Sequence, residues 1–199
     1  MELKELMKSA GIVGAGGAGF PSYAKLAEGA DTLLINGSEC EPLLYTDYII
    51  LKEELDTVIS GTATVMKMAG IPRAVLAIKE HTADRLNMSD GDTIARGITV
   101  KVLPNVYPIG DEISLIYESL GRVVKPGALP ISVGVIVYNV ETLYNVAKAE
   151  RSGEPVTEKW LTVGGAVDEP VVTCVPVGTC VNDLFKSLGV KVPEGYTLI

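Results

Sequence analysis

The sequence contains few of the residues that several classes of protein require. Its 199 residues include 3 cysteines and 1 histidine, and no two cysteines form a C-x-x-C pattern. These cysteines indicate neither a disulfide framework nor a zinc or iron–sulfur site, so no metal ligands are expected in this chain. A single histidine also disfavours acyl transfer by a Ser–His–Asp or Cys–His arrangement.

Basic residues and long apolar runs are also scarce. Lys and Arg number 17 against 25 Asp and Glu, which gives a formal net charge of −8. This charge argues against nucleic acid as a partner, because little would neutralise the phosphates. No apolar run reaches the roughly 18–20 residues that span a bilayer, and the first ten residues lack a signal-peptide core. We therefore expect a cytoplasmic protein without membrane insertion.

Strand and helix patterns alternate along most of the chain, and 47% of the residues are hydrophobic. This alternation predicts an α/β fold with a mostly parallel sheet flanked by helices. Buried strands are expected at residues 32–36, 74–79, 98–104 and 133–139, and helices at 2–10, 21–28, 47–69, 110–121 and 140–150.

The pattern changes near Ser152–Pro155 to a strand, a turn, a second strand and a helix, with Gly and Pro between them. We expect this part to be a small β-grasp (SLBB-like) unit that the chain leaves incomplete. The predicted domains are therefore an α/β domain over residues 1–152 and a partial β-grasp domain over residues 153–199.

A glycine-rich loop follows the first predicted helix and contains a G-x-G-x-x-G pattern. A dinucleotide-binding fingerprint of the Rossmann type needs a strand immediately before the glycines, whereas here a helix precedes them. Close approach of the backbone to a planar ligand or a phosphate explains the loop better than a flexible connector does. Its glycines are Gly14, Gly16, Gly17 and Gly19.

Three polar segments lie near the ends of predicted strands, namely residues 36–42, 107–112 and 139–142. In a parallel sheet they would converge on one crevice with the glycine loop. Each segment also has an explanation that involves no ligand. The acids of the first could be solvated loop charges, those of the second could complement a helix dipole, and Asn139 in the third could be a helix N-cap.

Together and in this order, these segments resemble the FMN- and NADH-binding flavoprotein subunit of respiratory complex I and its RnfC- and PduS-like relatives. The resemblance implies a domain with non-covalent FMN that takes hydride from NADH and passes electrons to an iron–sulfur or corrinoid acceptor protein. It extends over essentially the whole chain. The matching stretches are GIVGAGGAGFPSYAKL, DTLLINGSECEP, VLPNVYPIGDEISLIYESLGR, LPISVGVIVYNVETL and VTEKWLTVGGAV.

The resemblance also implies the residues of the site. It gives catalytic roles to Glu41 and Glu112, and it implies that the ring of Phe20 stacks on the nicotinamide. The residues expected to bind cofactor are Gly14, Gly16, Gly17, Gly19, Phe20, Lys25, Asn36, Ser38, Glu39, Tyr107, Gly110, Asp111, Asn139 and Thr142.

The sequence departs from the family pattern in ways that bear on NADH. Ala15 stands where complex I flavoproteins carry arginine, Tyr138 replaces the first of two asparagines, and Ser38 replaces an acid. The family pattern is therefore kept more fully for FMN than for NADH. We expect this chain to be a fragment of a longer protein. The 4Fe-4S clusters of the family are expected only in that longer protein, which would lie at the periphery of a membrane complex or a microcompartment. The alternative is a non-catalytic module of the same fold that binds a ligand or a partner.

Overall fold

The computed structural model of the chain describes residues 2–192 and residue 195. Its main element is a five-stranded sheet with the strand order β3-β4-β2-β1-β5. All neighbours are parallel except the edge strand β3, which pairs antiparallel with β4, so the predicted mostly parallel sheet is confirmed. The strands are β1 (Thr32–Gly37), β2 (Arg73–Lys79), β3 (Thr93–Ala95), β4 (Ile98–Leu103) and β5 (Val135–Asn139).

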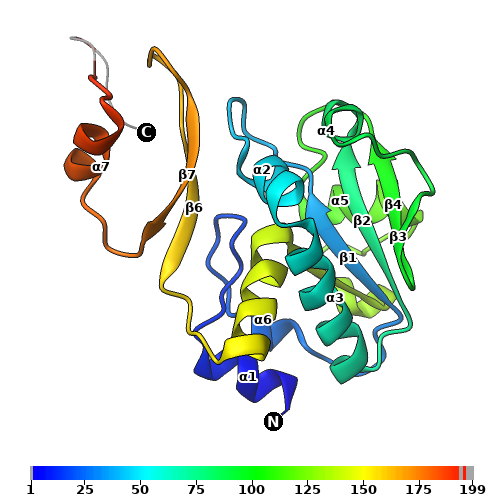
Figure 1. Cartoon of the computed structure of the whole chain (residues 1–199). Coiled ribbons are helices and arrows are strands. Elements are labelled where there is room, and N and C mark those ends of the chain that lie inside the picture. Colours follow the sequence, from blue (N-terminus) through cyan, green and yellow to red (C-terminus); the bar gives the residue numbers. More distant parts are fainter. Residues whose placement is uncertain (1, 193–194, 196–199) are drawn as a thin grey trace.

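Helices cover both faces of this sheet, as Figure 1 shows. One face carries α1 (Leu3–Ser9), α2 (Thr46–Glu53), α3 (Leu55–Ala69) and α6 (Val140–Ser152), and the other carries α5 (Glu112–Leu120). The remaining elements beside the sheet are α4 (Glu80–Leu86) and the short 3-10 helices η1 (Ser22–Lys25) and η2 (Pro130–Val133). Within residues 2–192, no helix has both the length and the apolar character needed to cross a membrane.

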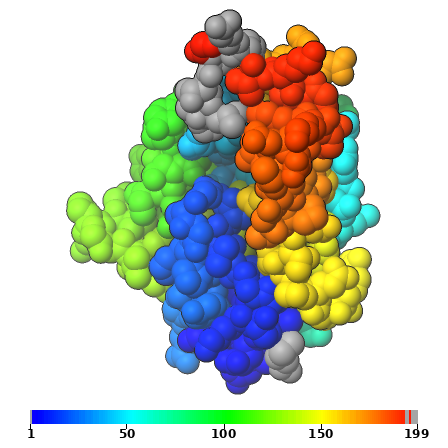
Figure 2. Space-filling view, turned by 90° about the vertical axis from the view of Figure 1, so that its left-hand side faces the viewer, coloured from blue at the N-terminus to red at the C-terminus, as the bar shows by residue number. Residues whose placement is uncertain are grey.

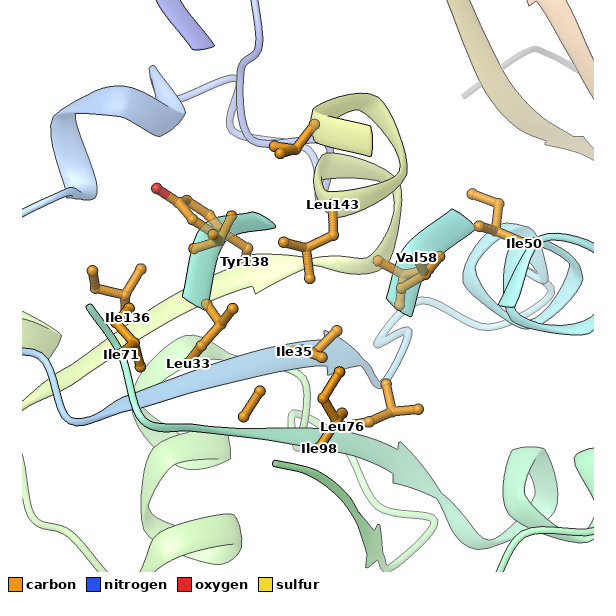
Figure 3. Packing of buried hydrophobic residues seen from close by; sticks show 14 of the residues in the cluster. Leu33, Ile35, Ile50, Val58, Ile71, Leu76, Ile98, Ile136, Tyr138 and Leu143 are labelled. Carbon is orange, nitrogen blue, oxygen red and sulfur yellow. The ribbon is translucent and has the colours of Figure 1, made fainter. Parts of the chain in front are cut away.

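Strand β1 is buried on both faces, which explains its continuous apolar sequence. Leu33 and Ile35 pack into the cluster shared with Val58 of α3 and Leu143 of α6, as Figure 3 shows. Leu34 belongs to the second cluster, on the α5 side. Alternate side chains of one strand therefore join two cores, and this fixes the register of the strand in the sheet.

The helix predicted over residues 47–69 is wrong in one respect, because it is divided at Glu54. This residue has φ −125° and ψ 25°, outside the helical region, and its carboxylate accepts a hydrogen bond of 2.7 Å from the Thr57 hydroxyl. The division leaves α2 beside the carboxyl ends of the strands while α3 packs along α6. No Gly or Pro marks the break, so the periodic pattern did not show it.

Two other expectations also need correction. The helix predicted at 21–28 is the single turn η1, because Pro21 pairs as a bridge with Val13 and Leu26 is extended. The segment between β2 and β4 contains, besides the partial helix that was expected, the edge strand β3, which the sequence analysis did not predict.

Beyond α6, the chain forms an antiparallel hairpin of β6 (Glu158–Val163) and β7 (Val171–Pro176), followed by α7 (Val181–Leu188). This is the order of elements that the sequence predicts. Figure 1 shows the hairpin standing beside the glycine loop and α6 rather than joining the main sheet, and Figure 2 shows the same part of the chain in orange and red next to the blue N-terminal region. The β-grasp identity of this part and the division at residues 152/153 stay predictions, and residues 193–194 and 196–199 lie outside the described chain.

The contact between α3 and α6 gives the first prediction. A Cβ added at Gly61 would lie 1.9 Å from the carbonyl oxygen of Leu143. Gly61→Ala should therefore destabilise the fold by about 1–3 kcal/mol, because two packed helices must separate. Denaturant unfolding measures this. The control is Ala63→Ser, at an exposed site of the same helix, which should lower the free energy of unfolding by only about 0.5 kcal/mol. Equal losses in the two variants would contradict the close contact described at Gly61.

Candidate functional site

A trough lies outside the carboxyl ends of β1 and β5, where the strand order reverses and ligands bind in open α/β sheets. It consists of three adjoining hollows. We call them the hairpin hollow, of about 780 Å³, the central hollow, of about 330 Å³, and the edge hollow, of about 410 Å³. Such volumes are those of small-molecule sites, roughly 300–1,000 Å³. Neighbouring hollows share lining residues, so the trough is continuous.

All sixteen residues that the sequence analysis selected line this trough. The structure therefore brings them together, while their roles toward FMN or NADH stay predictions. The hairpin hollow is lined by Gly16, Gly17, Asn36, Ser38, Glu39, Glu41, Tyr107, Gly110, Asp111 and Asn139. The central and edge hollows add Gly14, Gly19, Phe20, Lys25, Glu112 and Thr142.

The glycine loop is a closed turn that rests on the first turn of α6. The Gly14 N–H donates to the carbonyl oxygen of Phe20 at 2.7 Å, which closes the loop. The Ala15 N–H donates to the buried hydroxyl of Thr142 at 3.1 Å, which fastens the loop to α6. Helix α1 precedes the loop, so the context of an ordinary Rossmann fingerprint is absent from this segment, as predicted.

The tip of the loop presents backbone donors to the trough. The N–H groups of residues 16–19 donate to no atom of the part of the chain that the structure describes, and these residues are exposed. Gly17 and Gly19 have φ +116° and φ +61°, conformations that residues with a side chain rarely adopt. Four consecutive donors are thus available for anionic or carbonyl oxygens of a ligand.

The loop after β1 and the segment before α5 are in close contact. The Asn36 amide donates to the carbonyl oxygen of Gly110 at 2.9 Å and accepts from the Ser38 N–H at 3.0 Å. A Cβ at Gly110 would lie 2.0 Å from the Ser38 carbonyl oxygen, so only glycine permits this approach. The Ser38 hydroxyl is buried and donates to Ala77 at 3.1 Å. In this structure these groups build the floor of the trough.

Asn139 is the N-cap of α6, so the structural alternative considered for it is confirmed. Its Oδ1 accepts from the Glu141 N–H at 2.9 Å. Its Nδ2 lies 3.0 and 2.9 Å from the two carboxylate oxygens of Asp47, to which it donates. Asp47 is buried in the first turn of α2 and was not among the predicted site residues. The sequence offered one indication of Asp47, its position shortly after the stretch DTLLINGSECEP that resembles the family.

The hairpin supplies the outer wall of the trough through residues 159–162. The buried Glu141 accepts a hydrogen bond of 3.0 Å from the Trp160 N–H and forms an ion pair with Lys159. Thr162 accepts from the Tyr45 N–H at 3.2 Å. Sequence reasoning missed these wall residues, because a strand after the predicted domain boundary gave no indication that it would return to the site.

Two acidic residues at the start of α5 have different environments. Asp111 is the N-cap of the helix and accepts from the N–H groups of Ile113 and Ser114 at 3.1 Å each, as the helix-dipole alternative predicts. Glu112 instead pairs with Lys25, whose Nζ lies 2.5 Å from Oε1 and 3.2 Å from the Val137 carbonyl oxygen. The carboxylate expected to be catalytic is therefore charge-compensated.

Besides Asp111, which caps α5, three predicted residues have exposed side chains in the trough. Tyr107 is 76% exposed and Phe20 is 49% exposed. Glu41 is also exposed. Unlike the side chains that build the floor, these can contact a ligand without breaking the structure.

Two carboxylates that line the hairpin hollow, the buried Asp47 and the half-buried Glu39, have perturbed pKa values. Burial and the nearby charges of Glu39 and Glu141 raise the pKa of Asp47 well above its usual value, although the Asn139 amide opposes this. Burial also raises the pKa of Glu39, against the effect of backbone N–H groups in the first turn of α2, including that of Asp47 at 3.0 Å. The floor of the trough thus holds negative charge at an energetic cost.

The raised pKa of Asp47 predicts a pH dependence of stability. In the unfolded chain the pKa of this carboxyl is about 3.8. The stability that the protonated carboxyl contributes is fully present below that pH and is lost as the pH rises through the higher pKa of the folded state. Relative to Asp47→Asn, the wild type should therefore lose unfolding free energy as pH rises from about 4, by at most about 1.4 kcal/mol per pH unit.

Denaturant unfolding at a series of pH values measures this difference. The matched control is Asp56→Asn, at an exposed position in the first turn of α3. A difference between wild type and Asp47→Asn that stays constant with pH would contradict the environment described for Asp47.

Comparison with known proteins agrees with this geometry. Residues 7–148 match the model of the Nuo51 FMN-binding domain. The chain belongs to this family. The predicted family resemblance and the predicted fold class of the sheet domain are thereby confirmed.

Several relatives carry names of redox enzymes. The chain is 40% identical over 187 residues to the cobalamin reductase PduS of Citrobacter freundii, covering 94% of this chain and 41% of that protein. It is 35% identical over 205 residues to a component of the proton-translocating ferredoxin:NAD(+) oxidoreductase complex of Clostridium ljungdahlii, covering 98% and 45%. The chain thus spans less than half the length of these relatives.

A solved structure shows the same fold. The NAD+-reducing NiFe hydrogenase in its air-oxidized state superimposes with a TM-score of 0.74 at 25% sequence identity. The match covers 93% of this chain and 38% of the hydrogenase chain. This share is larger than the sheet domain alone, so the match extends into the residues that follow α6.

The residues of the trough fit the FMN that the family name implies. The loop tip offers four N–H donors that have no partner among the described residues, Lys25 offers a cation, and the acids and amides of the hairpin hollow offer acceptors for hydroxyl groups. The donors and acceptors lie along one continuous trough, as a ligand with a phosphate, a polyol chain and a ring system requires.

Proposed function

We propose that this chain is the FMN-binding domain of an NADH-linked electron-transfer flavoprotein that serves an iron–sulfur or corrinoid acceptor protein. The observation that carries the proposal is the glycine loop in a chain of the Nuo51 FMN-binding domain family. The loop lines a continuous trough, and four of its N–H groups have no partner within residues 2–192. Bound FMN would supply the redox chemistry, which is hydride acceptance followed by release of single electrons.

The predicted site residues divide into two groups by their hydrogen bonds. Asn36, Ser38, Asp111, Asn139 and Thr142 use side-chain atoms to hold segments of the protein together. We assign them the floor of the site. The groups left to contact FMN directly are the loop N–H groups, which suit phosphate or carbonyl oxygens, and the remaining acceptors of the hairpin hollow, which suit ribityl hydroxyls.

Lys25 has a separate role in this proposal. Its ammonium group lies in the central hollow between Glu112 and the Val137 carbonyl oxygen, with both charged side chains about one third exposed at 29% and 35%. A cation there lowers the cost of negative charge in the hollow, and it holds the Glu112 carboxylate in one place. Glu112 and Lys25 thus act as a pair rather than as independent groups.

Phe20 and Glu41 are assigned to the nucleotide substrate. The Phe20 ring is half exposed where the central and edge hollows meet, so one face can stack on a nicotinamide. Glu41 is exposed on the wall of the hairpin hollow, where it can accept hydrogen bonds from ribose hydroxyls. Neither group is needed for the floor.

FMN titration of the purified protein tests the cofactor proposal. Wild type should bind one FMN per chain, with quenched flavin fluorescence. Gly16→Ala should weaken binding roughly tenfold, because the added methyl would occupy ligand space in the hollows that Gly16 lines, although it makes only an ordinary contact of 3.8 Å with the Asn139 Cβ. The control is Gly164→Ala, which should bind FMN as wild type does. Its added methyl also makes only ordinary contacts, but Gly164 does not line the trough. A wild type that binds no FMN would end the proposal.

Anaerobic NADH tests the electron-transfer part with FMN-loaded protein. We expect bleaching of the flavin absorbance, and Phe20→Ala should raise the NADH concentration needed by roughly tenfold while FMN affinity stays unchanged. Phe185→Ala, which removes the other phenylalanine, in α7, is the control. FMN binding without bleaching would favour the alternative of a non-catalytic binding module.

A further inference from the structure

We infer that Glu141 is a positioning residue that couples the β6–β7 hairpin to the cofactor floor. This inference rests on the proposed FMN site and adds to it a residue outside the set that the family resemblance implies. Glu141 lies in the first turn of α6, two residues after Asn139, where it lines the hairpin hollow, and its carboxylate is bonded to β6.

The contacts of Glu141 are those of a buried anchor. Its side chain is 2% exposed, yet both carboxylate oxygens have partners. Oε1 accepts from the Trp160 N–H at 3.0 Å, and Oε2 pairs with the Lys159 ammonium group. A buried carboxylate held by a backbone donor and a cation resists displacement, because loss of either partner leaves a desolvated charge.

The same turn of α6 carries the groups that hold the floor and the glycine loop. The backbone N–H of Glu141 donates to Asn139 at 2.9 Å, and the next residue, Thr142, accepts from the Ala15 N–H at 3.1 Å. The hairpin and the glycine loop are thus fastened to adjacent residues of one helical turn. Movement at Glu141 is transmitted to both sides of the trough.

The hairpin has other contacts with the sheet domain, both polar and apolar, and Trp160 packs against the main hydrophobic cluster. Thr162 bonds with Tyr45 and Thr46 at 3.2 and 3.0 Å, and Trp160 meets the Tyr144 ring edge-on at 6.3 Å. Lys148 of α6 also pairs with Glu158 of β6 at 3.0 Å, at an exposed position outside the trough. Among these contacts, the buried carboxylate of Glu141 is the one that joins the wall made by residues 159–162 to the turn of α6 that also holds the glycine loop.

The test compares Glu141→Gln with Glu158→Gln, the same substitution at the other ion pair between α6 and β6. Two constants are measured well below the unfolding temperature. One is FMN affinity by flavin fluorescence, and the other is acrylamide quenching of Trp160, the single tryptophan of the chain. Glu141→Gln should weaken FMN binding roughly tenfold and increase the quenching, while Glu158→Gln changes neither.

A residue with a merely structural role would lower the unfolding temperature and leave both constants of the folded protein unchanged. That result, or increased quenching with unchanged FMN affinity, would overturn the inference. If Glu141→Gln does not fold, Lys159→Gln replaces it, since Lys159 is partly exposed and its loss should weaken FMN binding roughly threefold. Failure of wild type to bind FMN would instead count against the proposed function.

Discussion

The first turn of α6 is the point on which the trough depends. Asn139 caps the helix and binds Asp47 of α2, Glu141 binds the hairpin, and Thr142 binds the glycine loop. Three segments that are distant in sequence are thereby held around the carboxyl ends of β1 and β5. Each bond is short-range and directional, so this one turn of helix fixes where the three segments lie around the trough.

Holding several carboxylates in and near the floor of the trough lowers the stability of the folded protein. Asp47, Glu39 and Glu141 are carboxylates in or near the floor, and burial raises the pKa of the first two. The apolar clusters on the two faces of the sheet provide the stability against which this cost is set. The acids hold other groups in place, which leaves the loop N–H groups, Phe20 and Glu41 available to ligands.

The sequence predicted the sheet domain because its strands are short apolar runs between clear helix signals, as in β1 and β5. It also selected residues that all line one trough, since polar segments at the ends of parallel strands must converge. It did not show that Asn36 and Ser38 would be engaged with the protein itself, or that Asn139 would bind Asp47 besides capping α6, because partners such as Gly110 and Asp47 are distant in sequence. The break at Glu54 and the return of β6 to the site depend on tertiary packing, which local patterns do not contain.

Backbone hydrogen exchange at residues 16–19 tests the central claim most directly. These four N–H groups donate to no atom of the described protein, so they should exchange rapidly in the free chain. If they are the donors that hold FMN, saturation with FMN should slow their exchange strongly, while the N–H of Ala15, already bonded to Thr142, changes less. Bound FMN with continued rapid exchange at all four residues would contradict the account.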